Sequence, residues 1–284
     1  MGDEISFASC LPDLIRDSKE VVIECDRRLE GLFKRSFSGC YVIGSRYDQD
    51  PDPSIPRDFD ARVALGQLPE FYRNKTEDFP GVPYLTPHPS MRTQWRALLD
   101  SLGPEPKIGI AWTGGRRQTG RDRRSVTLET LLPILKYPAH WVSLQYQTSS
   151  WERDKILAMI ERPEEIEAFE ERHGIPIHHW PWGTQSYDYD QTAALVAELD
   201  LVIAVTTAVV DLAGALGVEC WTLVPSKPVW RHLGGRGGSD FPWAKSVTLY
   251  RQKGNEWPVH ILAGKLKDKF DNSVGRKEAV QAAA

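Results

Sequence analysis

The chain has 284 residues, of which 41% are hydrophobic and 10% aromatic, enough for one large domain or two ordinary ones. A net charge of −4 argues against a protein that coats nucleic acid, and no apolar run approaches the roughly 20 residues of a transmembrane segment. The four scattered cysteines (Cys10, Cys25, Cys40 and Cys220) contain no C-x-x-C pair, so we expect thiols in a reducing cytoplasm rather than a zinc site or disulfides.

Helical and extended patterns alternate along the first hundred residues. Apolar periodicity predicts helices over residues 5–16, 28–36 and 91–102. Short, largely apolar runs predict strands over residues 21–25, 40–43 and 61–65, and a proline-rich polar loop covers residues 48–57. The last of these helices stops at Gly103-Pro104, and the Pro104-Glu105-Pro106 segment reads as a linker, so we place a first domain at residues 1–103.

The alternation restarts after the linker. Strands are predicted over residues 107–112, 141–145, 175–178, 201–205, 220–224 and 247–250, and helices over residues 126–136, 151–172, 191–199, 208–216 and 258–270. We assign residues 104–270 to a second domain, whereas residues 271–284 have little to bury and are expected to form a disordered tail. Two successive strand–helix arrays predict an α/β protein with two doubly wound, Rossmann-like domains facing each other.

The most informative stretch is residues 199–217, which read LDLVIAVTTAVVDLAGALG. The apolar run over residues 201–205 has the length and β-branching of a strand buried on both faces of a parallel sheet. Thr206 and Thr207 follow it directly and are suited to cap the next helix, whose first N–H groups lack internal partners. This junction predicts a binding site for a phosphorylated ligand at the carboxyl edge of the sheet.

A second anion-binding candidate opens the second domain. After the strand that ends at Trp112, a loop carries two glycines and several arginines, namely Gly114, Gly115, Arg116, Arg117, Arg121, Arg123 and Arg124. Arginine suits bidentate recognition of phosphate, although a solvated basic loop is the alternative interpretation. His178 and His179 resemble a ligand pair, but neighbours on a strand point to opposite faces, which favours a structural placement.

Taken in order, several motifs resemble a known family. They are GDEISFASCLPDLI (2–15), GIAWTG (109–114), Arg124-Ser125, VSLQ (142–145), TAALVAELDLVIAV with its TAV and LAGALG continuation (192–217), Pro228-x-Trp230-Arg231, Pro242-Trp243 and LYRQ (249–252). This string resembles the glycosyltransferase domain often found behind tetratricopeptide repeats, which is similar to glycosyltransferase family 9, the heptosyltransferases. The resemblance runs from residue 2 to about residue 266 and includes no tetratricopeptide repeats.

The resemblance implies a GT-B fold, with an acceptor-side domain and a nucleotide-sugar-binding domain on either side of a cleft, and no required metal or other cofactor. Related chains carry a strand before their Gly-Asp motif, so the first domain here is expected to lack its first strand. Gly2-Asp3 matches that motif, which implies that Asp3 is the general base. The alternative is a helix-start carboxylate that only stabilises the helix dipole, worth ~0.3–1 kcal/mol.

The resemblance also implies a donor site in the second domain. The residues expected there are Trp112, Gly114, Arg124, Gln145, Thr206, Thr207, Ala208, Asp211 and Arg231. The family usually reads VDTAVAHLAGA, whereas this chain has Thr206 in place of the aspartate and Asp211 in place of the histidine. At 4 Å and an effective dielectric of 20, the repulsion of a carboxylate on a diphosphate is ~4 kcal/mol, unless a neighbouring arginine cancels it.

We therefore predict a cytoplasmic glycosyltransferase of hexosyl or heptosyl type, inverting and metal-independent by family analogy. It would transfer a sugar from a nucleotide diphosphate-sugar to a hydroxyl on a glycan, a protein or a modified nucleobase. Two alternatives stay open. One is a non-catalytic nucleotide-sugar-binding remnant of the family, and the other is a glycosyltransferase that acts specifically on modified DNA or protein.

Overall fold

The computed structural model describes residues 1–44, 58–114, 120–146, 163–184, 188–232 and 238–282, with side chains to residue 271. Within these ranges the strands are β1 (Val22–Cys25), β2 (Tyr41–Gly44), β3 (Lys107–Ala111), β4 (His140–Ser143), β5 (Ile177–His178), β6 (Leu201–Val205), β7 (Cys220–Val224) and β8 (Val247–Arg251). The helices are α1 (Gly2–Phe7), α2 (Leu11–Asp17), α3 (Glu30–Ser36), α4 (Leu68–Tyr72), α5 (Pro89–Asp100), α6 (Leu128–Leu135), α8 (Glu164–His173), α9 (Pro181–Thr184), α10 (Tyr189–Val196), α11 (Ala208–Leu216) and α12 (Val259–Ala282). The protein is an α/β structure with two parallel sheets.

The larger sheet has six parallel strands in the order β5-β4-β3-β6-β7-β8. The chain builds outward from β3 in one direction and then from β6 in the other, which is the doubly wound order of a Rossmann fold. The reversal falls between β3 and β6, whose paired residues run from Ile108 with Leu201 to Ala111 with Ala204. Ligands of such sheets bind in the crevice at the carboxyl ends of the two strands that flank the reversal.

Alternate side chains of the large sheet enter two different cores. Ile108, Ile110, Ile203 and Val205 pack with α6, α8 and α12 on one face. Val202 and Ala204 point the other way, toward α10 and α11. Because both faces are covered, all five residues of β6 are buried, which explains its uninterrupted apolar sequence.

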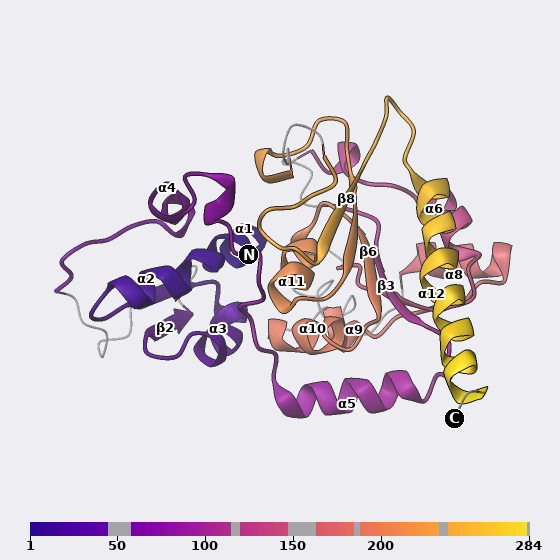
Figure 1. The fold of residues 1–284 in the computed structure, drawn as a ribbon, viewed down its shortest axis with the longest axis horizontal. Helices are drawn as coiled ribbons and strands as arrows, with labels where there is room; N and C mark the ends of the chain where they lie inside the picture. The colour runs from indigo at the N-terminus through magenta and orange to yellow at the C-terminus, as the bar shows by residue number, and fades with distance from the viewer. Residues whose placement is uncertain (45–57, 115–119, 147–162, 185–187, 233–237, 283–284) are drawn as a thin grey trace.

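The N-terminal segment continues the second of these cores. β1 and β2 form a two-stranded parallel sheet, and Ile5, Leu29 and Phe33 join the cluster that includes α10 and α11. Helix α1 lies beside α11, and α5 runs below the large sheet against α10 (Figure 1). The two halves of the chain therefore meet through continuous apolar packing at α1 and α5.

The structure confirms most predicted elements, including the β6–α11 junction, and corrects two expectations. Residues 61–64 form no strand and are exposed, because no neighbouring strand pairs with them. Helix α12 continues to Ala282, into the segment expected to be a disordered tail. The expected loop at 48–57 and most of the basic loop, 115–119, lie outside the described residues, as do residues 151–162 of the charged helix, whose described part is α8.

The cysteines are free thiols, with Cys10, Cys25 and Cys220 buried and Cys40 half-buried. Burial raises the pKa of the Cys25 and Cys220 thiols to about 12, so both stay protonated and unreactive at neutral pH. Among the described helices, none combines the length and apolar composition needed to cross a lipid bilayer.

Close packing of α11 on the β8 side yields a stability prediction. A Cβ on Gly214 would lie 2.6 Å from the Cβ of Ala244 and 3.2 Å from a methyl of Val247, so Gly214→Ala should lower the free energy of unfolding by about 1–3 kcal/mol. A Cβ on Gly264, in α12, meets no atom within 4 Å. Gly264→Ala should therefore stabilise the protein by up to about 1 kcal/mol. Urea denaturation of both variants checks the pair, and equal effects would contradict the packing described.

Candidate functional site

The candidate site lies where the loops after β3 and β6 meet. A Cβ on Gly114 would lie 3.1 Å from the carbonyl oxygen of Thr206 and 3.3 Å from that of Arg124. The N–H of Gly114 donates a hydrogen bond of 3.2 Å to the Ser125 hydroxyl. Glycine thus lets the loop after β3, the Arg124-Ser125 segment and the end of β6 come together at the switch point of the sheet.

Helix α11 begins at this point with a capped N-terminus. The Thr207 hydroxyl accepts a hydrogen bond of 3.0 Å from the N–H of Val209, as its cap position predicts. The Thr206 side chain is only 2% exposed, and its hydroxyl has no hydrogen-bond partner among the described residues. A buried hydroxyl without a partner beside a helix N-terminus is a feature of anion sites rather than of a closed core.

Arg231 links two carboxylates across this helix start. Its guanidinium pairs with Asp3 of α1, and its Nη2 lies 3.4 Å from Oδ2 of Asp211 on α11. The Arg231 side chain is 9% exposed, whereas that of Asp3 is 73% exposed. The carboxylate predicted to be a base is therefore open to solvent and held on one side by a largely buried arginine.

Aromatic rings cover the other side of this arginine. The Cζ of Arg231 lies 5.4 Å from the ring centroid of Phe7, which is cation–π distance. Phe7 in turn stacks on Trp230 and meets the edge of Trp243. This packing holds the guanidinium against the two carboxylates.

Arg124 belongs to the same electrostatic cluster. Burial lowers the pKa of its guanidinium, Asp3 raises that pKa, and Arg231 lowers it. Arg124 stays cationic, since an arginine does not lose its proton in a protein. Two arginines therefore stand close to one helix N-terminus, a fitting arrangement for a ligand with two phosphoryl groups.

Asp211 sits inside this group of charges. Burial raises the pKa of its carboxyl to about 7, opposed by Arg231 and reinforced by Asp3. Near neutral pH the carboxyl is therefore present both with and without its proton. The repulsion expected between Asp211 and a bound anion is reduced by protonation as well as by Arg231.

The structure brings together Asp3, Gly114, Arg124, Thr206, Thr207, Ala208, Asp211 and Arg231, and it places the other two predicted residues differently. Trp112 is fully buried in the core under α6, so its ring does not face the site. Gln145 is buried as well, and its side-chain oxygen accepts hydrogen bonds from the N–H groups of Trp112, at 3.3 Å, and Thr113, at 3.0 Å. Gln145 thereby supports the loop that leads to Gly114.

No protein-family model matches the chain. Protein FlbA of Caulobacter vibrioides is 30% identical to it over an alignment of 263 residues, and the match covers 88% of this chain and 41% of FlbA. The chain thus spans less than half the length of this relative.

Two solved structures from E. coli are also similar. Heptosyltransferase WaaC with ADP-2-deoxy-2-fluoro heptose aligns over 96% of both chains, with a TM-score of 0.49 and 11% identity. ADP-heptose lipopolysaccharide heptosyltransferase II aligns over 75% of this chain and 61% of its own, with a TM-score of 0.44 and 14% identity.

One residue of the site region was not predicted. His232, next to Arg231, is 3% exposed, and its pKa falls to about 3 through burial and the proximity of Arg231, Arg251 and Arg124. It is therefore neutral at physiological pH and contributes no charge to the cluster. Its position beside a site arginine in the Trp-Arg-His sequence was the available signal.

The first of the two adjacent histidines, His178, lies in β5 and has a structural placement, as expected, whereas His179 follows the strand. The His178 ring stacks on Trp180 at 5.5 Å and lies 5.7 Å from the ring of His140. Among the described residues, no group of three or more histidine, cysteine, aspartate or glutamate side chains is arranged to hold a metal ion.

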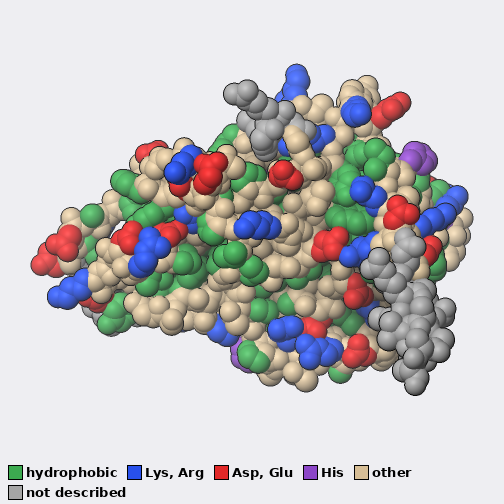
Figure 2. Space-filling view, in the orientation of Figure 1, with side chains coloured by type: hydrophobic (Ala, Val, Ile, Leu, Met, Phe, Trp, Pro, Cys, Tyr) green, Lys and Arg blue, Asp and Glu red, His purple; other side chains and the backbone are tan. Residues whose placement is uncertain are grey.

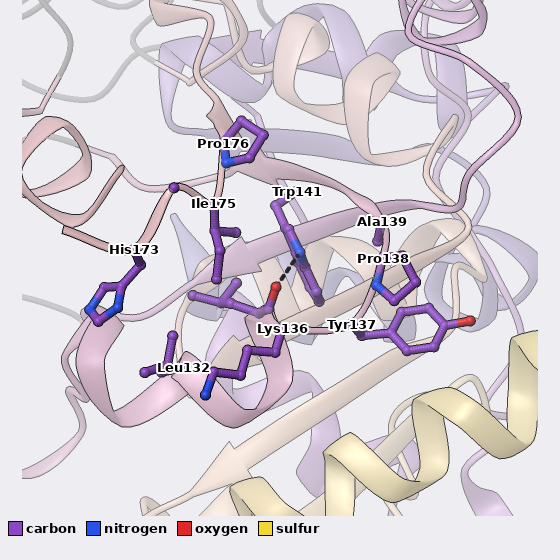
Figure 3. Close-up of a pocket in the computed structure, with 11 residues that line it drawn as sticks. Leu132, Lys136, Tyr137, Pro138, Ala139, Trp141, His173, Ile175 and Pro176 are labelled. Atoms are coloured by element: carbon purple, nitrogen blue, oxygen red, sulfur yellow. Dashed lines mark hydrogen bonds between the residues drawn. The ribbon is translucent and has the colours of Figure 1, made fainter. Parts of the chain in front are cut away.

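A cavity of about 360 Å³ lies at the opposite end of the large sheet, at the amino end of β4. Leu132, Trp141 and Ile175 line it between α6 and α8, and the Trp141 indole donates a hydrogen bond to a backbone oxygen (Figure 3). It is separate from the α11 site, which is at the carboxyl edge.

On the face drawn in Figure 2, acidic and basic side chains are interspersed, without the large basic field typical of a nucleic-acid coat.

The raised pKa of Asp211 predicts a pH-dependent effect on stability. The folded-state pKa lies above the unfolded value of about 3.9, so the folded protein binds this proton more tightly than the unfolded chain does. The resulting stabilisation is fully present below the unfolded pKa of about 3.9. The stabilisation is lost as the pH rises through about 7. Asp211→Asn is neutral at every pH, so relative to wild type it should gain on the order of 2 kcal/mol between pH 5 and pH 8.

Urea denaturation at both pH values measures this difference, and comparing the two removes the constant cost of the lost contact with Arg231. Glu165→Gln, an exposed change on α8, is the matched control and should show no such dependence. The same stability difference between Asp211→Asn and wild type at both pH values would show that Asp211 does not titrate in this range.

Proposed function

We propose that the chain is a glycosyltransferase that moves a sugar from a nucleotide diphosphate-sugar to a hydroxyl of an acceptor. The observation that carries the proposal is the meeting of Arg124, Arg231 and the capped start of α11 beside the exposed carboxylate of Asp3. Positive charge for a leaving diphosphate and a base for an attacking hydroxyl thus lie in one place, as this reaction requires.

The donor diphosphate fits the positive side of the site. Arg124 and Arg231 offer planar forks of N–H donors beside the N-terminus of α11, where the helix dipole favours an anion. The buried Thr206 hydroxyl supplies a further donor that no described residue occupies. These groups favour the charge that grows on the diphosphate as its bond to the sugar breaks, which is the largest source of rate in such a site.

Asp3 is suited to act as the base. Its carboxylate is 73% exposed, so an acceptor hydroxyl can reach it from solvent. As the hydroxyl oxygen bonds to the anomeric carbon, its proton passes to Asp3 and the electron pair of the broken C–O bond leaves with the diphosphate. A single in-line displacement of this kind inverts the configuration of the sugar, and it needs no cofactor besides the donor.

A non-catalytic, nucleotide-sugar-binding protein is the second candidate. Two observations favour it. The proposed base, Asp3, is paired with Arg231, one of the proposed phosphate ligands, and a carboxyl group, Asp211, lies inside the anion site. The acceptor, whether glycan, protein or modified nucleobase, is a separate question from either candidate. We also propose a cytoplasmic location, which suits free thiols.

Turnover of nucleotide sugars tests the proposal. Purified protein incubated with a panel of UDP-, GDP- and ADP-sugars should transfer or hydrolyse at least one donor, detected by mass spectrometry. Asp3→Ala should then lower turnover by about 100-fold or more while donor binding remains. Nucleotide binding without turnover would support the non-catalytic candidate, and neither binding nor turnover with any donor would refute both.

The role of Arg124 has a matched control in the same turn. Arg124→Ala should weaken donor binding by about tenfold or more, because it removes a charged hydrogen-bond donor to phosphate. Arg123→Ala removes a neighbouring exposed arginine and should leave binding unchanged. Calorimetric titration with the donor identified by the panel measures both, and equal losses would assign the effect to general charge instead of to Arg124.

A further inference from the structure

Arg231 is the residue on which the two halves of the proposed site depend. It comes from the turn Trp230–His232, and its guanidinium contacts a carboxylate of α1 and a carboxylate of α11 at once. Its Nε has no hydrogen-bond partner among the described residues. A largely buried arginine with a remaining donor is not fully committed to the partners it has.

Carboxylate and phosphate groups bind a guanidinium in the same way and can therefore compete for it. Both accept the two parallel N–H bonds that the planar fork of an arginine presents. The carboxylate of Asp3 is mostly in water, where its attraction to Arg231 is weakened by solvent. A diphosphate held by Arg124 and the start of α11 would carry more negative charge than the Asp3 carboxylate.

We propose that Arg231 is an exchange switch, in which the donor diphosphate takes the guanidinium from Asp3 and Asp211 and thereby releases Asp3 to act as the base. This inference rests on the proposed function and adds the order in which donor and acceptor take part. Before the donor binds, Arg231 holds Asp3 in an ion pair. Afterwards Asp3 is free to accept the proton of the acceptor hydroxyl, so the donor binds before the acceptor reacts.

The backbone fixes the geometry of this exchange. A Cβ on Gly2 would lie 3.2 Å from the Cβ of Ala208 and 3.2 Å from Oδ2 of Asp211, so α1 rests directly on the first turn of α11. This contact sets Asp3 and Asp211 on either side of one guanidinium. Asp211 lies deep enough to anchor Arg231 without donor, whereas Asp3 faces the solvent from which an acceptor arrives.

A double-mutant cycle tests the switch through binding of ADP, UDP and GDP, measured by calorimetry at one salt concentration and at pH 8, where most of the Asp211 carboxyl carries its charge. Asp211→Asn and Asp3→Asn each remove a competitor for Arg231, so each should tighten binding of the preferred nucleotide by about fivefold or more. In an Arg231→Gln background the same substitutions should change affinity by less than about twofold. Glu165→Gln is the control for loss of a distant exposed carboxylate.

The cycle separates exchange from plain repulsion. If each carboxylate only repels the nucleotide, the gain persists without Arg231, and the switch is overturned. If wild type binds a nucleotide but neither asparagine variant tightens it, the switch is also wrong while the proposed function stands. If no nucleotide binds wild type, the proposed function and the switch fall together. Asp3 is on the surface, so its variant keeps the test decisive even where Asp211→Asn is poorly folded.

Discussion

The contact between α1 and the first turn of α11 is the constraint on which the site depends. Gly2 has no side chain, and a methyl group there would already touch Ala208 and Asp211. The close approach carries Ile5 into the core shared with α10 and α11 and leaves Asp3 at the edge, beside Arg231. Apolar burial along one side of α1 thus decides which carboxylate meets the charged groups of the second half of the chain.

The charges around α11 balance one another only as a group. Asp211 by itself would be an unpaired carboxyl in a buried position, which is costly, and its raised pKa reflects that cost. Arg231 by itself would be a largely buried cation with the same problem. Together they are tolerated, and Phe7 completes the surroundings of the guanidinium on its apolar side. The removal of any one member changes the state of the others, which is why the cluster is best treated as a unit.

Sequence patterns predicted the parts of this arrangement that are local. Strand β6, its two threonines and the cap of α11 are consecutive residues, so their order alone predicts a buried strand that ends at a helix start. The doubly wound sheet follows from alternation of strand and helix. The strand expected at residues 61–65 was wrong for the converse reason, because a short apolar run does not supply the neighbouring strand that a strand needs.

Contacts between residues far apart in sequence could not be predicted in this way. Asp3, Asp211 and Arg231 are far apart in sequence, and nothing in the pattern around any of them specifies the other two. The ring of Trp112 shows the same limit, since position at a strand end does not say which face it takes. Alternation along β3 places Trp112 on the face of Ile108 and Ile110, in the core.

The structure leads to a different interpretation of Asp211, which stands where the family usually has a histidine. A fixed negative charge near a diphosphate would oppose binding by roughly 4 kcal/mol at 4 Å and an effective dielectric of 20. Because burial raises the pKa of Asp211 to about 7, taking up a proton at neutral pH costs almost no free energy, far less than that repulsion. Under the proposed function, an arriving diphosphate would raise this pKa further and so favour the neutral carboxyl. Arg231 would then lose a partner just as a stronger one becomes available, so the aspartate at position 211 is compatible with an anion at the helix start.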